Sequence, residues 1–572
     1  MDITHPFISK QIIAYIGNKR RLLPLIATAL NELDTRIQQP PVFIDPFAGS
    51  GVVSRLAKLR GYKVYANDWE HFSYILLRAY LCTSPSDIEL LFGSHKEFNR
   101  YLHYLNTLPN PLPEEEYIAR HYAPSTEDPE QADFKRERLF YTRENALIID
   151  RIRNEIEHSF PAETGIYEIE TKRMLLIGML LYKAATHTNT SGVFKAFHKG
   201  FGGYGRDALK RILTPITLTA PPLIENTEEI KISQKDANEL VKEKDKQNID
   251  ITYLDPPYNQ HQYGSNYHLL NTIALWDEGA VPIQHNPKGE LSNKAGIRPD
   301  WVKTRSDYCY KNKAVEAFSE LLASIHSRYV LISYSTDGII PFDTLRSICE
   351  RKGELQVLTN EYIKYRGGKQ SNKRKNRNIE FVFTIDCDSK TTPVSRSLFK
   401  KEIIKRKFLL LLKHRYHLSK LTETFQLDHK TETLIIESEN HLFYLPTEHF
   451  FQFPAIANDN SLSAEVERFF KLLSVEQIHH ISEKLDNAAC CSKTDELKEL
   501  FYRLQNGEKN SDYFITKIPD TLQKIAHKKN REVFSRYMNQ AVSLKEKFPA
   551  KAEKIEKKLK KVQEQATRRF SN

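Results

Sequence analysis

The chain is poor in cysteine and lacks any long apolar run. It has six cysteines among 572 residues. Only Cys490 and Cys491 are adjacent, and there is no Cys-x-x-Cys pair or Cys/His cluster. We therefore expect no disulfides and no structural metal. No apolar stretch reaches the roughly eighteen residues that a membrane helix needs. The N-terminus also lacks the charged-then-apolar build of a signal peptide, so we expect a soluble, cytoplasmic protein with no membrane partner.

Internal repeats are absent as well, so the chain should carry a single catalytic site of one kind. A length of 572 residues predicts two to four domains with real hydrophobic cores. Basic residues outnumber acidic ones, 84 to 73, which gives a formal charge of +11. A surplus of this sign favours a polyanionic partner.

The most informative motif follows the apolar run 249–254 and reads Asp255-Pro256-Pro257-Tyr258. Proline fixes its own φ, has no N–H to donate and holds its predecessor extended. The carbonyls of Asp255 and Pro256 can therefore face outward as free acceptors. Two acceptors suit the two hydrogens of a planar amino group, and Tyr258 offers a face on which its ring can stack. The alternative is a plain turn that ends a strand.

A second motif lies near the N-terminus. Residues 41–44 have the character of a buried strand, Asp45 ends it, a glycine-rich turn follows, and 52–59 show helical spacing. In a doubly wound α/β sheet this first strand-to-helix turn borders the ligand crevice. The turn is neither Gly-x-Gly-x-x-Gly nor a P-loop, so pyrophosphate is not the implied ligand. The next strand, 63–67, ends at Asp68, a spacing that suits a carboxylate binding ribose hydroxyls. Together these features predict an adenosine-type cofactor.

These motifs resemble those of the DNA adenine-N6 methyltransferases that use S-adenosylmethionine. Asp-Pro-Pro-Tyr at 255–258 is similar to their catalytic motif, and Asp-Pro-Phe-Ala-Gly-Ser-Gly at 45–51 to their cofactor loop. A third match, Tyr-Ile-Gly-Asn-Lys-Arg-Arg-Leu-Leu at 15–23, and the order of the three are those of the Dam-like (alpha) group. The stretch 259–270 looks closest to methyltransferases of type II and type IIS restriction–modification systems. It departs from them at His261, where arginine is usual.

The resemblance implies roles for particular residues. The catalytic set is Asp255, Pro256, Pro257 and Tyr258. The cofactor-binding set is Tyr15, Lys19, Asp45, Phe47, Gly49, Gly51, Asp68, Asp236 and Asp255. Within this set we expect Lys19 beside the cofactor's carboxylate, Asp68 at its ribose and Asp236 at its adenine amino group. No metal is implied.

The implied fold class is α/β: a Rossmann-like S-adenosylmethionine-dependent methyltransferase sheet with an inserted target-recognition domain and a mainly helical C-terminal region. We expect a split catalytic domain at 1–80 and 226–388, a target-recognition region at 81–225, and a helical accessory domain of unknown role at 389–572. Helical spacing occurs at 136–157, 174–185, 314–326, 400–418, 464–473 and 475–485.

Two polar segments are candidates for DNA contact. The loop 187–200 mixes amides, hydroxyls, bases and aromatics, which suits both phosphate and base-edge contacts, although a solvated connector can have the same composition. The strongly basic loop 367–377 lies between strands expected at 361–366 and 379–386 and suits a phosphate clamp. The predicted DNA contacts are Asn189, Thr190, Lys195, Lys199, Lys373, Arg374 and Lys375.

The predicted reaction is methyl transfer to the N6 amine of an adenine that has flipped out of duplex DNA. The protein would be the protective half of a restriction–modification system, with a separate endonuclease acting on the same site. Two alternatives stay open: an RNA adenine methyltransferase, and a non-catalytic DNA-binding subunit. The intact acids Asp45, Asp68 and Asp255, together with Tyr258, weigh against the second alternative.

Overall fold

The computed structural model describes most of the chain in two compact units. Described are residues 3–203, 206, 208–243, 249–359, 379–412, 416–428, 433–438, 441–446, 460–490, 492–505, 511–527 and 530–571. The first unit comprises Met1–Asn360 and Glu380–Arg396, and the second comprises Glu361–Ile379 and Ser397–Asn572.

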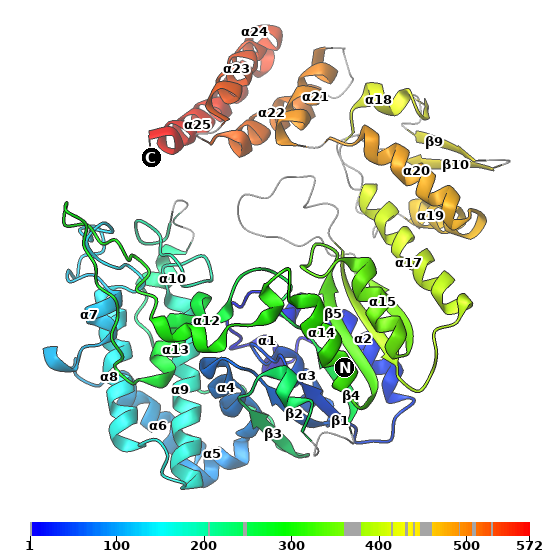
Figure 1. The fold of residues 1–572 in the computed structure, drawn as a ribbon. Helices are drawn as coiled ribbons and strands as arrows, with labels where there is room; N and C mark the ends of the chain where they lie inside the picture. The colour runs from blue at the N-terminus through cyan, green and yellow to red at the C-terminus, as the bar shows by residue number, and fades with distance from the viewer. Residues whose placement is uncertain are drawn as a thin grey trace. The chain divides into compact units, whose positions relative to one another are not determined.

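A seven-stranded sheet forms the centre of the first unit (Figure 1). The first five strands in spatial order run parallel. The sixth is antiparallel to both its neighbours. In spatial order the strands are β3 (Ile230–Ser233), β2 (Lys63–Asn67), β1 (Val42–Asp45), β4 (Ile249–Leu254), β5 (Ser327–Ser335), β7 (Glu380–Asp386) and β6 (Glu354–Thr359). β4 and β5 are almost wholly buried, as expected of strands covered on both faces. The predicted Rossmann-like α/β class is confirmed.

The strand order reverses beside β1, and this reversal positions the functional site. From β1 the chain runs outward through β2 to β3, then returns to place β4 on the other side of β1. In open α/β sheets a crevice forms at such a switch point, outside the carboxyl ends of the strands. The motifs at 45–51 and 255–258 follow the two central strands and therefore meet at this crevice.

Helices flank the sheet. α2 packs on β6 and β7, and α3 on β1 and β2. The helices and short turns of this part are α1 (Pro6–Ser9), η1 (Lys19–Arg21), α2 (Leu23–Asp34), α3 (Val52–Leu59), α11 (Ala237–Leu240), α12 (Tyr263–Asn266), α13 (His268–Leu275), η5 (Pro299–Thr304), η6 (Asp307–Cys309), α14 (Ala314–Ser324) and α15 (Phe342–Lys352). The helix expected at 314–326 is present as α14.

A group of helices between β2 and β3 packs around a hydrophobic core that it shares with α13. Its elements are α4 (His71–Leu77), η2 (Arg78–Cys82), α5 (Pro85–Phe92), α6 (His95–Asn106), η3 (Pro113–Glu115), α7 (Ile118–Tyr122), α8 (Arg143–Ser159), α9 (Tyr167–His187) and α10 (Leu209–Leu213). The helix expected from 136 begins only at Arg143, because the Thr142 side chain caps it by accepting from the Asn145 backbone N–H at 3.1 Å. Gly178 of α9 lets η2 approach closely, since a Cβ there would lie 2.4 Å from that of Ala79.

The strand that pairs with β7 differs from the expected one. The hairpin was expected to join 361–366 to 379–386, but the observed partner of β7 is β6, in the register Thr359 opposite Phe381 and Glu354 opposite Asp386. Both segments alternate in polarity, so alternation alone did not distinguish them. Residues 361–366 and the basic loop 367–377 lie outside the described residues.

The second unit has its own core and a small sheet. Its helices are α17 (Pro393–Leu411, which starts in the first unit), α18 (Leu418–Thr422), α19 (Asn460–Leu472), α20 (Val475–Ala488), α21 (Lys493–Gln505), α22 (Ser511–Ile525), α23 (Arg531–Val542), α24 (Leu544–Lys547), η9 (Pro549–Lys551) and α25 (Ala552–Ser571). The antiparallel strands β8 (Gln426–Asp428), β9 (Thr433–Ser438) and β10 (His441–Pro446) were not anticipated.

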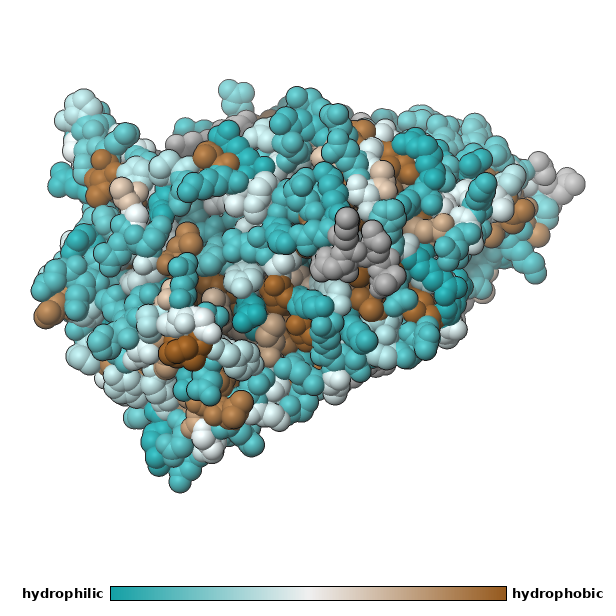
Figure 2. All heavy atoms as spheres, turned by 60° about the horizontal axis from the view of Figure 1, so that its bottom comes forward, coloured by the Kyte–Doolittle hydropathy of each residue, from teal (hydrophilic) through white to brown (hydrophobic). Residues whose placement is uncertain are grey.

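The surface is largely polar where Figure 2 shows it. On that face hydrophobic residues form small, separate groups within a mainly hydrophilic surface. Among the described helices, none combines the length and the apolar character needed to cross a membrane.

Candidate active site

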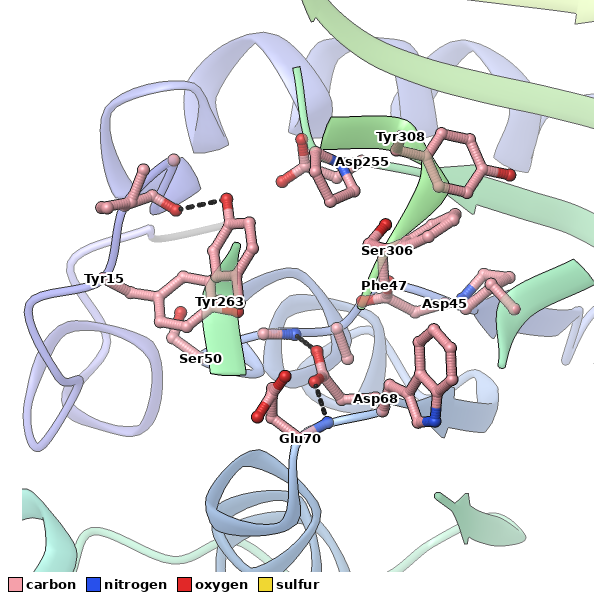
Figure 3. Close-up of a pocket in the computed structure, with 18 of the residues that line it drawn as sticks. Tyr15, Asp45, Phe47, Ser50, Asp68, Glu70, Asp255, Tyr263, Ser306 and Tyr308 are labelled. Carbon is pink, nitrogen blue, oxygen red and sulfur yellow. Dashed lines mark hydrogen bonds between the residues drawn. The ribbon is translucent and has the colours of Figure 1, made fainter. Parts of the chain in front are cut away.

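A pocket lies at the carboxyl ends of β1, β2 and β4, where the switch point predicts it. Figure 3 shows Asp255 on one side of this space and Asp68 and Glu70 on the opposite side, with Tyr15 and Tyr263 at one end. The lining residues come from 15–19, 45–53, 68–70, 235–237, 253–263 and 304–308. The structure thus brings together the three sequence motifs that lie far apart in the chain.

The loop 45–51 owes its path to two glycines. Gly49 has φ +53°, and a Cβ there would lie 2.8 Å from the Tyr15 ring. Gly51 has φ +74°, and a Cβ there would lie 2.9 Å from Leu77 Cδ2. Because a side chain is both strained and crowded at these positions, glycine is required at each. Gly49 lines the pocket. Gly51 stands at the start of α3 and is not among the residues that line the pocket, so its contact with the cofactor stays a prediction.

The end of β2 fastens this loop in place. The Ala48 N–H donates to the Asn67 carbonyl at 2.9 Å, and the Asn67 side-chain amide donates to the Pro46 carbonyl at 3.0 Å. The Gly49 N–H donates to Asp68 Oδ2 at 2.8 Å, as Figure 3 shows. Asp68 therefore shapes the loop as well as facing the pocket.

Three buried acids cluster around the loop. Asp68 Oδ1 accepts from the Glu70 N–H at 2.9 Å, and Glu70 Oε2 accepts from the Asn271 amide at 2.6 Å. Burial raises the pKa of Asp68 to about 6 and that of Glu70 to about 7. Burial likewise raises the pKa of Asp45 to about 8, although Ser54 Oγ donates to Asp45 Oδ2 at 2.7 Å. Raised values of this kind are typical of functional sites.

The carboxylate at the end of β4 is paired with a buried lysine. Lys19 Nζ lies 2.6 Å from Asp255 Oδ1 and donates to the Gly17 carbonyl at 2.8 Å. Only 4% of the Lys19 side chain is exposed. Its ammonium also lies 5.0 Å from the centre of the Tyr258 ring. Lys19 also lines the pocket, so its contact with the cofactor's carboxylate stays a prediction; in this structure its charge is paired with Asp255.

Aromatic rings bound the pocket at both ends. Tyr15 stacks on Tyr263 and Tyr267, with ring centres 5.2 and 4.9 Å apart. At the other end the edge of one ring meets the face of the other in the pair Phe47 and Tyr308, 5.3 Å between centres. Flat apolar surfaces of this kind suit a flat heterocycle.

The remaining predicted residues divide into two groups. Asp236 lines the pocket, and its Oδ1 also caps α11 by accepting from the backbone N–H groups of Asn238 and Glu239 at 2.8 and 3.2 Å. Pro257 and Tyr258 line the pocket, whereas Pro256 does not. Pro256 can still act through its backbone carbonyl, which is the group that the sequence argument invoked.

Several lining residues escaped the sequence analysis: Glu70, Tyr263, Thr304, Ser306 and Tyr308. Ser306 reaches the site because the Gln262 side chain pairs with its backbone, accepting from the N–H at 2.8 Å and donating to the carbonyl at 2.9 Å. Such a tertiary contact has no periodic signal in the sequence. Glu70 and Tyr263 stand close to recognised motifs, and that position was the only signal in the sequence that could have found them.

The predicted DNA contacts fare differently from one another. The Asn189 side chain is fully buried: its amide N–H groups donate to the Leu139 and His198 carbonyls, and its oxygen accepts from Gly202. Its amide is thus used inside the protein in this structure, and a base contact by Asn189 stays a prediction. Thr190 is 9% exposed. Lys195 and Lys199 are exposed. Lys373, Arg374 and Lys375 lie outside the described residues.

Comparison with known proteins gives a consistent result. The model of D12 class N6 adenine-specific DNA methyltransferases matches residues 15–348. The type II methyltransferase M.NlaIII of Neisseria lactamica is 33% identical over 372 residues, 64% of this chain and 97% of its own. M.FokI of Planomicrobium okeanokoites is 33% identical over 396 residues, 69% of this chain and 55% of its own. The modification methylase LlaI of Lactococcus lactis subsp. lactis is 32% identical over 415 residues, 70% of this chain and 59% of its own.

The matched region contains the whole lining of the pocket, from Tyr15 to Tyr308. The catalytic edge, the cofactor loop and the N-terminal segment of this chain therefore fall where the family model applies. The chain belongs to the D12 class of N6 adenine-specific DNA methyltransferases.

Proposed function

We propose that the pocket of Figure 3 binds S-adenosylmethionine and that an adenine flipped out of duplex DNA enters beside Asp255. The observation that carries the proposal is the shared space. The Asp255 edge and the loop 45–51 line one pocket, so a methyl donor held by the loop lies next to an amine held by the edge.

The donor set of the pocket fits this cofactor. Asp68 and Glu70 supply buried carboxylates for ribose hydroxyls, and Phe47 and Tyr308 supply aromatic surface for the adenine ring. S-adenosylmethionine supplies a methyl group that its sulfonium charge has already activated. Buried acids with raised pKa values favour a cationic ligand, because a nearby positive charge stabilises their ionised forms.

At the target base the chain holds and orients an amine. The lone pair of the adenine amine is delocalised into the ring, which makes it a poor nucleophile. Hydrogen bonds from the amine to Asp255 and to the Pro256 carbonyl localise that lone pair toward the methyl group. The salt bridge from Lys19 holds the Asp255 carboxylate in place, and Tyr258 stacks on the base. Positioning of this kind can supply much of the acceleration, and the base reaches the edge by leaving the helical stack.

The biological role that we propose is the modification half of a restriction–modification system. M.NlaIII and M.FokI are named type II methyltransferases, and LlaI is named a modification methylase. A separate endonuclease with the same recognition site would then be the functional partner. Coexpression with the candidate endonuclease should leave cellular DNA intact only when the methyltransferase is active.

The direct test is methyl transfer from labelled S-adenosylmethionine to duplex DNA, followed by identification of the modified nucleoside. We expect N6-methyladenine. Asp255→Asn keeps the size of the side chain but removes its charge, and it should lower turnover by about two orders of magnitude or more. Calorimetry should show that the variant still binds S-adenosylmethionine. Modified cytosine, label in single-stranded RNA only, or near-normal turnover of Asp255→Asn would contradict the proposal.

A further inference from the structure

The segment between α13 and α14 contains a small β-hairpin that none of the sequence motifs covers. The Ser292 N–H donates to the Gln284 carbonyl at 2.8 Å, and the Asn286 N–H donates to the Glu290 carbonyl at 2.9 Å. These bonds, with the single antiparallel bridge between His285 and Leu291, fold residues 284–292 into a short hairpin. In Figure 1 the segment that carries it runs beside α7 of the inserted helices.

A buried arginine fixes the base of this hairpin. Arg138 is 4% exposed, and its guanidinium donates to the Asn293 carbonyl at 3.0 Å and to the Pro282 carbonyl. On the hairpin itself the Leu291 N–H donates to the Lys135 carbonyl at 2.8 Å. The ribbon is therefore held in place before any partner binds, which lowers the entropy cost of binding.

The two faces of the hairpin differ. Gln284 and Ser292 stand opposite each other and are both exposed. His285 pairs with Leu291, so these two share the other face, on which Leu291 is buried and His285 is exposed. Lys288 is exposed at the tip. Among the described residues, the side chains of Gln284, Ser292 and Lys288 make no hydrogen bond or ion pair, so they are available to a partner.

The hairpin belongs to a basic segment that leads into the pocket. Residues 282–313 contain seven Lys or Arg and three Asp or Glu. Thr304, near the end of this segment, lines the pocket. Lys294 of this segment and Lys199 of the inserted loop lie over the same Phe134 ring, at 5.4 and 5.3 Å from its centre. Positive charge from two parts of the chain thus gathers beside the hairpin.

We propose that the 284–292 hairpin enters a groove of the duplex near the target adenine and contributes to sequence recognition, an inference that rests on the proposed function. Gln284 and Ser292 contact base edges, and Lys288 contacts a phosphate. The major groove admits a two-stranded ribbon, and an amide can pair with adenine through two hydrogen bonds.

The test is a comparison of sequence preference. Wild type and the double variant Gln284→Ala/Ser292→Ala methylate a library of duplexes with randomised sequence, and sequencing identifies the modified sites. We expect the double variant to lose discrimination by about tenfold or more at one or more base pairs. Lys288→Ala should weaken binding to all duplexes alike and reduce the salt dependence of that binding. His285→Ala, on the opposite face of the same hairpin, is the matched control and should keep the wild-type preference.

Calorimetry with S-adenosylmethionine shows in each case that the variant is folded. An unchanged site preference in the double variant overturns the proposal. So does a uniform loss on every sequence, because that result makes the pair a backbone contact. A changed site preference in His285→Ala alone also overturns the proposal, because it places the base contacts on the opposite face of the hairpin. If the wild-type protein methylates no duplex in the library, it is the proposed function that is wrong. That result differs from the outcomes above, in all of which the wild type is active.

Discussion

Each of the two compact units contains a lysine bound closely to a shielded carboxylate, and the two pairs are built in opposite ways. In the first unit Lys19 meets Asp255 at 2.6 Å, joining the N-terminal segment to the end of β4. In the second unit Lys493 meets Glu496 at 2.5 Å, one turn further along α21. The first pair depends on the tertiary fold, whereas the second depends on a single helix.

The surroundings of the pairs give them different meanings. Lys19 and Asp255 line a pocket together with aromatic rings and further acids. Glu496 lies in the first turn of its helix, where a negative charge complements the helix dipole. A buried charge therefore indicates function when it faces a pocket that a ligand can enter. It indicates a structural role when a helix or another part of the protein already compensates it.

The largest effect should separate the pairs directly. Lys19→Met should reduce methyl transfer by about two orders of magnitude, because Asp255 loses the charge that positions it. Lys493→Met should leave turnover unchanged and cost about 1 kcal/mol in stability, a modest figure because Lys493 is 30% exposed. Steady-state kinetics and thermal unfolding of both variants are the measurements. Equal losses of turnover in the two would remove the distinction.

The next effect concerns the acids of the pocket. Asp68→Ala should weaken S-adenosylmethionine binding by about tenfold or more, since a charged hydrogen-bond acceptor is worth about 1.5–3 kcal/mol. The loop 45–51 also loses its bond from Gly49 to Asp68. Glu499→Gln, which changes a buried acid of the second unit, is the control. If calorimetry finds that Asp68→Ala binds S-adenosylmethionine as tightly as the wild type, Glu70 and not Asp68 is the acid that binds the ribose.

A truncation after Arg396 tests the division between the units. The seven-stranded sheet and the pocket belong to the first unit, so the shortened protein should bind S-adenosylmethionine with unchanged affinity. We expect DNA binding to weaken by about tenfold at moderate salt, because basic surface of the second unit is lost. Filter binding at several salt concentrations measures this. A truncated protein that neither folds nor binds the cofactor would show that the two units depend on each other, and one with unchanged DNA affinity would assign the second unit another role.

The smallest effect is a dependence of stability on pH. The pKa of Glu70 is raised to about 7 from its ordinary 4.5, so the folded state favours the protonated form. Its contribution is present below about pH 4.5 and is lost as the pH rises through about 7. Glu70→Gln should flatten that decline and raise the midpoint of unfolding at pH 8 by about 3 °C relative to wild type. Differential scanning calorimetry from pH 5 to 8 measures it. If the stability of the variant falls with pH as steeply as that of the wild type, the pH dependence comes from Asp45 and Asp68 instead.

The sequence predicted the parts of the site that follow strands. Asp45, Asp68 and Asp255 end three strands, and parallel strands that share an edge must bring such residues together. Ser306 was missed because it reaches the pocket through the Gln262 contact. Tyr308 was missed because its hydroxyl donates to Asn238 Oδ1; both contacts are fixed only in three dimensions. Composition could not show that the Asn189 side chain is buried, since an asparagine in a polar loop can either face solvent or hold the loop together.

Chain segments of similar pattern set a second limit. The strand at 354–359 and the segment 361–366 both alternate, and the pairing with β7 decided between them. The short strands β9 and β10 lie in a region rich in Lys, Leu and Glu, and their stability comes from pairing with each other and from the core that they share with α19. Local propensity is a weak guide where packing decides.

The ring of Tyr15 joins the two halves of the site. It lies against Gly49 on one side and stacks on Tyr263, which follows the catalytic motif, on the other. We therefore expect a movement of the cofactor loop to shift the ring, and with it the helix that carries Tyr263. If the proposed cofactor and the flipped base both bind here, their affinities are linked: the factor by which the cofactor changes the affinity for the base equals the factor by which the base changes the affinity for the cofactor.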